Sequence, residues 1–105
     1  MSEKKKVLFA PYYDIFGPRA MPHIQRLQEK GFEVICNPLN RFYTEEELCD
    51  ALQGVWGTMA AAEPYTERVF QAAKDLRIIS RWGVGYDYVD VAAATRHGVL
   101  VAMAF

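Results

Sequence analysis

The sequence predicts an α/β fold in which helices cover both faces of a five-stranded parallel sheet. Short apolar runs alternate with amphipathic segments along the chain, the connections between them are short, and the first run, at residues 7–10, is apolar throughout. Strands of a parallel sheet are buried on both faces, so they lack a regular polar alternation. Right-handed crossovers between such strands favour the doubly wound order 2-1-3-4-5, which is the flavodoxin-like arrangement.

The expected elements alternate from one end of the chain to the other. Strands are expected at residues 7–10, 32–36, 54–59, 76–80 and 99–103. The first helix is expected to follow a loop at residues 12–18, to carry Pro22 in its first turn and to stop at Gly31. No helix is expected after the last strand, so apolar sheet surface should remain uncovered. This indicates either a homodimer or a domain excised from a larger protein.

Local chemistry marks where the other three helices begin. Thr44 and Glu47 have the spacing of a capping box, in which each side chain binds the backbone N–H of the other residue. Thr66 is the expected cap of the third helix, with Val69 facing inward behind it. Asp90 is the expected cap of a short helix at residues 91–96.

The bulk composition excludes several classes of function. The chain has 105 residues, a formal net charge of -1 and no long basic run, so no nucleic-acid surface is expected. No apolar stretch approaches the roughly 20 residues of a membrane span, and no signal pattern is visible. Two cysteines, Cys36 and Cys49, fit neither a disulfide framework nor a metal cluster. They are expected to be buried thiols in a reducing, cytoplasmic setting.

The stretch "SRWGVGYDYVD", residues 80–90, carries the chemistry of greatest interest. Gly83 and Gly85 follow the fourth strand, where a dinucleotide-binding turn would begin. That fingerprint requires a third glycine, but its position holds Tyr88. The acidic residues Asp87 and Asp90 lie where they would meet a pyrophosphate directly. The pattern is therefore a poor match to a nucleotide site.

Three other kinds of site found on such sheets do not match this sequence either. A phospho-acceptor domain needs an aspartate after strand three and a lysine after strand five, where this chain has Met59-Ala60 and Met103-Ala104. The loop after strand one is aromatic and acidic, unlike a flavin-phosphate loop, and no Cys-x-x-Cys is present. Two glycines can instead turn backbone amides toward a small carboxylate, with Arg81 adding positive charge. The residues alone leave open that the glycines only form a tight turn.

Residues 76–101, "LRIISRWGVGYDYVDVAAATRHGVLV", closely resemble the end of the substrate-binding domain of the D-isomer-specific 2-hydroxyacid dehydrogenases. "AEPYTERVF" at residues 62–70 is similar to the segment that precedes it in that family. The resemblance implies a flavodoxin-like substrate domain beside a separate NAD(P) domain. It also implies that the amides of Val84 and Gly85 bind the substrate carboxylate and that Gly83 permits the turn.

The resemblance further implies what this chain lacks. The family's catalytic arginine, glutamate and histidine and its nucleotide motif lie beyond such a domain, so residues 1–105 are expected to be one domain of a truncated enzyme, inactive alone. No catalytic, cofactor-binding or metal residue is expected here, and NAD or NADP is implied for the parent. His23 and His97 are expected to be surface or structural residues. Ala60 and Ala61 stand where phosphoglycerate dehydrogenases carry an Arg-Ser pair, which disfavours a phosphorylated substrate.

The expected ligand is thus a small 2-keto or 2-hydroxy acid. No nucleic acid or membrane partner is expected. A homodimer is expected to form through the uncovered apolar surface. A stand-alone ligand-binding or interaction domain, without catalysis, is the alternative.

Overall fold

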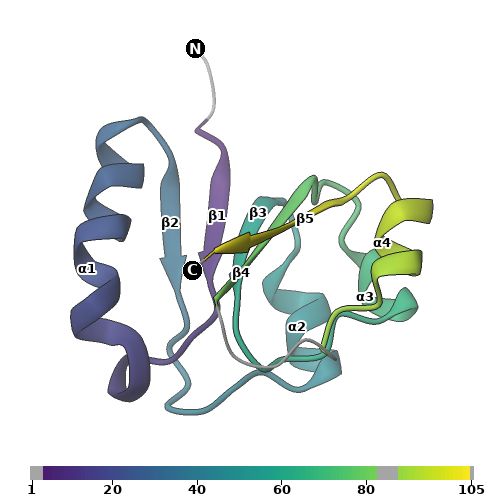
Figure 1. Ribbon diagram of the computed structural model, residues 1–105, viewed down its shortest axis with the longest axis horizontal. Coiled ribbons are helices and arrows are strands. Elements are labelled where there is room, and N and C mark those ends of the chain that lie inside the picture. The colour runs from purple at the N-terminus through teal and green to yellow at the C-terminus, as the bar shows by residue number, and fades with distance from the viewer. Residues whose placement is uncertain (1–3, 83–87, 105) are drawn as a thin grey trace.

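The computed structural model describes residues 4–82 and 88–104, and these form the predicted α/β architecture. Within these ranges the strands pair in parallel in the order β2-β1-β3-β4-β5. The elements are β1 (Lys6–Phe9), α1 (Tyr13–Glu29), β2 (Glu33–Cys36), α2 (Glu45–Ala51), β3 (Val55–Ala60), α3 (Glu67–Ala72), β4 (Ile78–Trp82), α4 (Val91–Arg96) and β5 (Leu100–Ala104). Helix α1 covers one face of the sheet, and α2, α3 and α4 cover the other (Figure 1).

The main core lies on the three-helix face. Leu8 of β1 and Ile79 of β4 are fully buried there against Leu48 of α2 and Val69 of α3. The inward position predicted for Val69 is therefore confirmed. Burial of a side chain of this size contributes roughly 1.5–3 kcal/mol, so this face holds most of the stabilising apolar contact.

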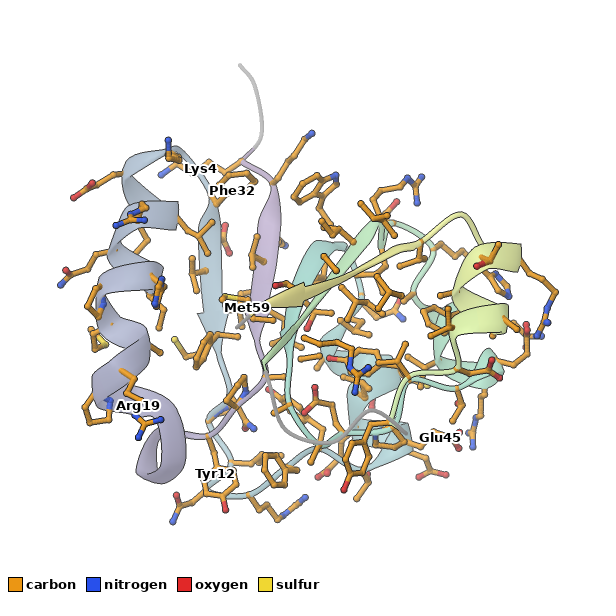
Figure 2. All side chains as sticks on the ribbon, viewed as in Figure 1. Lys4, Tyr12, Arg19, Phe32, Glu45 and Met59 are labelled. Carbon is orange, nitrogen blue, oxygen red and sulfur yellow. The ribbon has the colours of Figure 1, made fainter. Side chains whose placement is uncertain are left out.

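The α1 face has a much smaller core. Phe9 packs against Ala20 and Ile24 of α1, and Met59 contacts this group from a partly buried position. Away from α1, Leu100 of β5 is 64% exposed. Figure 2 shows Arg19 on α1 and Glu45 at the start of α2 on opposite sides of the sheet. Apolar surface is thus left uncovered on the α1 face of the described chain, as expected.

The three predicted helix caps are confirmed. The Thr44 hydroxyl accepts from the N–H of Glu47 at 3.3 Å, and a Glu47 carboxylate oxygen accepts from the N–H of Thr44 at 2.9 Å. Thr66 accepts from the N–H of Val69 at 3.4 Å. Asp90 Oδ1 accepts from the N–H of Ala93 at 3.0 Å. Each helix on the larger core therefore starts where its own sequence specifies.

Two expectations were wrong. The segment expected as a loop at residues 12–18 is helical from Tyr13, so Pro18 and Pro22 lie inside α1. Both prolines are on the exposed side of the helix, where the carbonyl groups that lose a partner can bind water. Cys36 was expected to be buried but is exposed, because it ends the edge strand β2; Cys49 is partly buried.

Candidate functional site

The carboxyl edge of the sheet is where a parallel α/β fold binds its ligands. Here that edge is formed by the residues that follow β1, β3 and β4. Pro11 lies after β1, Ala60 ends β3 and Trp82 ends β4. Ala60 pairs with Arg81 across the sheet, so the loop after β3 begins beside the segment that follows β4.

Arg81 is the one predicted site residue that the structure describes, and it lies at this edge. Arg81 lies in β4, between Ala60 of β3 and Met103 of β5, and it is only 7% exposed. It shares a face of β4 with Ile79, so its side chain leaves the sheet toward the three-helix core. Gly83, Val84 and Gly85 lie outside the described residues, and their assignment to a carboxylate stays a prediction.

The chain is anchored on both sides of these three residues. Before them, β4 pairs with both β3 and β5. After them, an isolated parallel bridge joins Val89 to Tyr65. In that bridge the N–H of Tyr65 donates to the carbonyl of Tyr88 at 2.7 Å, and the N–H of Asp90 donates to the carbonyl of Tyr65 at 2.9 Å. The loop after β3 therefore holds the far end of the proposed turn.

A buried polar network lies directly behind this bridge. Glu63 is fully buried, and its Oε2 accepts from the Tyr65 hydroxyl at 2.7 Å and from the N–H of Ala61 at 2.8 Å. The Tyr65 hydroxyl also lies 3.1 Å from the Thr58 hydroxyl. Since Tyr65 donates its only proton to Glu63, the Thr58 hydroxyl donates to Tyr65. The network thus connects β3 to the loop that follows it.

Burial sets the electrostatics of this network. Desolvation raises the pKa of the Glu63 carboxyl, and the hydrogen bonds from Tyr65 and Ala61 offset part of that shift. Burial also raises the pKa of Tyr65 well above its ordinary value, with the nearby Glu63 adding to the shift. Among the described residues, Glu63 Oε1 has no hydrogen-bond partner. A glutamate that precedes a proline is typical of an exposed turn, so the sequence pattern does not predict this network.

The two histidines lie where structural roles were expected. His23 is an exposed residue of α1. His97 follows α4, where its Nε2 lies 2.6 Å from Glu67 and its ring stacks on Phe70 with centroids 6.0 Å apart. Hydrogen bonds from Arg96 and then His97 hold the pKa of Glu67 at about 2. His97 therefore ties α4 to α3.

The start of α4 does not fit a dinucleotide. The Asp90 carboxylate already accepts from the N–H of Ala93, so the first turn of α4 is capped by a negative charge. A pyrophosphate placed there would meet this carboxylate instead of free amide donors. Across the described parts of the chain, no group of three His, Cys, Asp or Glu residues is placed to hold a metal ion, and no helix is both long and apolar enough to cross a membrane.

A separate groove of about 320 Å³ lies on the α1 face. Its floor is formed by Gly57, Met59 and Ile78 of the sheet, and its basic rim by Arg26 and Lys30 of α1. It lies on the other side of the sheet from the Glu63 network.

Comparisons with known proteins agree with this geometry. The sequence matches the family described as D-isomer specific 2-hydroxyacid dehydrogenase, catalytic domain, over residues 13–104. It is 38% identical over 90 residues to a glyoxylate reductase of Thermococcus kodakarensis, covering 83% of this chain and 27% of that enzyme. It is 40% identical over 76 residues to a D-3-phosphoglycerate dehydrogenase of Sus scrofa, covering 71% of this chain and 14% of that enzyme.

Solved structures give the same result. A Staphylococcus aureus NAD-dependent formate dehydrogenase in complex with NAD superposes with a TM-score of 0.73 at 26% identity, over 94% of this chain and 32% of that one. A cofactor-bound 3-phosphoglycerate dehydrogenase of Entamoeba histolytica shares the fold, with a TM-score of 0.78 at 21% identity, over 96% of this chain and 33% of that one. The chain spans about a third or less of these relatives. It belongs to the D-isomer specific 2-hydroxyacid dehydrogenase family, within that family's catalytic domain.

Proposed function

We propose that this chain is the substrate-binding domain of a two-domain, NAD(P)-dependent D-2-hydroxyacid dehydrogenase. The observation that carries the proposal is the family match over residues 13–104, which includes the Gly-Val-Gly stretch that follows β4 in the sequence. In the whole enzyme, hydride would pass between NAD(P)H and a small 2-keto acid. The α4 start is capped by Asp90, so we assign the nucleotide to a different domain.

The proposed role of this chain is to hold the substrate carboxylate. The amide groups of Val84 and Gly85 are the assigned donors, Gly83 permits the turn, and Arg81 supplies positive charge at the edge. The bridge between Tyr65 and Val89 supports this assignment because it fixes the chain beyond the turn. Preorganised amide donors bind a carboxylate without a large ordering cost.

Nuclear magnetic resonance titration of the chain with glyoxylate, hydroxypyruvate and D-lactate tests this role. Binding at millimolar concentration is expected, with shifts at residues 81–90. Val84→Pro removes one amide donor and should abolish binding, whereas the control Val84→Ala keeps it and should bind. The absence of binding to all three acids would overturn the proposed role.

We further propose that the substrate carries no phosphate. Ala60 ends β3 nearly fully buried, and the N–H of Ala61 is engaged by Glu63, so the loop after β3 offers a buried carboxyl where a phosphate would need cations. Hydroxypyruvate is expected to bind at least as tightly as 3-phosphohydroxypyruvate, because residues 61–66, which follow β3, include no lysine or arginine for the phosphate. Clearly tighter binding of the phosphorylated acid would contradict this assignment.

The chain alone is proposed to be inactive, because hydride transfer needs the nucleotide and a proton donor held together with the substrate. Oxidation of NADH with glyoxylate should stay at the background rate. Turnover above background that is lost in Val84→Pro would overturn this proposal.

We also propose a homodimer through the exposed sheet surface on the α1 face. Parallel sheets are normally covered on both faces, but Leu100 is exposed and Ile78 is only partly buried on this one. A second copy of the same surface is the proposed cover. Light scattering should give a dimer at high concentration, and a monomer would contradict the proposal. A cytoplasmic location is proposed as well, since Cys36 and Cys49 are both free thiols; cell fractionation tests it.

A further inference from the structure

Glu63 is the residue whose position the proposed function does not explain. Its side chain is fully buried at the carboxyl edge of the sheet, although glutamate is rarely buried without a charged partner. None of the ion pairs formed by the described residues includes Glu63. One of its oxygens accepts two hydrogen bonds, and the other, Oε1, accepts none within the described chain. Such an arrangement is costly for an ionised carboxylate.

Tyr65 links this carboxyl to the proposed substrate turn. Its hydroxyl is held by Glu63 and Thr58, while its backbone N–H and carbonyl bind Tyr88 and Asp90. The Tyr65 side chain is fully buried, so water cannot replace a hydrogen bond that its hydroxyl loses. A shift of Tyr65 therefore displaces the backbone to which the far end of the turn is hydrogen-bonded.

We propose that Glu63 is a positioning residue which, in its protonated form, acts through Tyr65 to hold the Tyr88–Asp90 end of the substrate turn. The inference rests on the proposed carboxylate-binding function. The protonated carboxyl still accepts both hydrogen bonds through Oε2 and brings no buried charge. When it ionises, the negative charge is shared with Oε1, which has no hydrogen-bond partner among the described residues, and the network becomes less stable.

The surroundings of Glu63 support this assignment. Glu63 influences two titratable hydroxyls, those of Tyr65 and Tyr43, and the pKa of each is raised by burial first and by Glu63 next. Arg81 is the buried cation that leaves the same face of the sheet from β4. Because desolvation raises the pKa of Glu63, its ionisation occurs at a higher pH than that of an exposed glutamate. The substrate is also an anion, so an ionised Glu63 would disfavour it further.

Hydrogen exchange of the ligand-free chain tests the coupling directly. The Asp90 amide, which donates to Tyr65, should lose protection as pH rises through the Glu63 ionisation, after correction for the intrinsic exchange rate. The Asn37 amide, which donates to Phe9 on the other part of the sheet, is the internal reference. In Glu63→Gln the Asp90 amide should show no such pH dependence. The control Glu46→Gln alters an exposed carboxylate and should behave like the wild type.

Glyoxylate titrations from pH 5 to pH 9 test the functional consequence. The wild-type affinity should fall as pH rises, and the affinity of Glu63→Gln should stay constant. Tyr65→Phe removes one buried hydrogen bond and should weaken binding by about fivefold at low pH. A merely structural Glu63 would change stability but leave the pH profile of binding intact.

The outcomes separate the two proposals. If the wild type binds glyoxylate and Glu63→Gln keeps the wild-type pH profile in both measurements, the role of Glu63 is overturned. If the wild type binds no acid but the Asp90 amide follows Glu63 as described, the coupling stands and the proposed function fails. A folded Tyr65→Phe with unchanged Asp90 protection would also contradict the coupling.

Discussion

The two faces of the sheet are built very differently. On one face, three short helices enclose an extensive core in which Leu48, Val69 and Ile79 are fully buried. On the other face, one long helix covers only part of the strands, and a groove runs beside it. Most of the buried apolar contact therefore lies on the three-helix face, which also contains Glu63 and Tyr65, the proposed support of the substrate turn. The α1 face is the proposed surface for a second copy.

Leu48→Ala should have the largest effect. Removing a fully buried leucine from the larger core leaves a cavity and should lower the free energy of unfolding by about 3 kcal/mol. Ile24→Ala, in the small core beneath α1, should lower it by about 2 kcal/mol, because that site borders open surface. Urea denaturation measures both values. If Ile24→Ala lowers the free energy of unfolding as much as Leu48→Ala or more, the two faces do not differ in their contribution to stability.

Thr44→Ala should have an intermediate effect. It removes the hydroxyl that caps α2 and should lower the free energy of unfolding by about 1 kcal/mol. Thr44→Ser keeps the hydroxyl and should remain close to the wild type. Thermal unfolding of the three proteins checks this, and equal midpoints for Thr44→Ala and Thr44→Ser would show that the cap does not contribute.

Acidification should weaken the three-helix face by a smaller amount. The pKa of Glu47 is lowered to about 2, first by its hydrogen bond from Arg41, and that of Glu67 to about 2, first by its hydrogen bond from Arg96. A lowered folded-state pKa gives stability that is present above pH 4.5, the ordinary value, and is lost as pH falls toward 2. Unfolding curves between pH 5 and pH 2 should show this loss. Glu67→Gln should reduce it, and an unchanged pH dependence would contradict the assignment.

Leu100→Lys should have the smallest effect on stability. Leu100 is 64% exposed, so the free energy of unfolding of the monomer should change by less than about 0.5 kcal/mol. If a second copy covers this surface, the substitution should convert the dimer to a monomer in light scattering. If Leu100→Lys is still a dimer, the interface does not include the surface around Leu100.

Much of the fold is predictable because its determinants are local. The hydroxyl of Thr66 and the carboxylate of Asp90 bind amides only three residues away, so their roles follow from spacing alone. The apolar strand runs and short connections give the strand order. The beginning of α1 was not predictable from the same rules, since whether Pro18 and Pro22 are tolerated depends on which side of the helix faces solvent.

The candidate site was only partly predictable. The Gly-Val-Gly stretch is recognisable because the family resemblance is carried by consecutive residues. Glu63 and Tyr65 are not, since their burial depends on the packing of β3, α2 and α3 around them. A sequence pattern gives no sign that a glutamate before a proline turns inward, or that its partner is a tyrosine hydroxyl.

The bridge between Tyr65 and Val89 has a consequence for the continuity of the chain. Peptide bonds between Gly83 and Asp87 join two parts that are also held without them: β4 by its pairing with β3 and β5, and residues 88–90 by their hydrogen bonds to Tyr65. A single proteolytic cut in that interval should leave two fragments that remain associated under native conditions and separate only in denaturant. We therefore expect that the chain can be cut, or circularly permuted, between Gly83 and Asp87 while the two parts stay together.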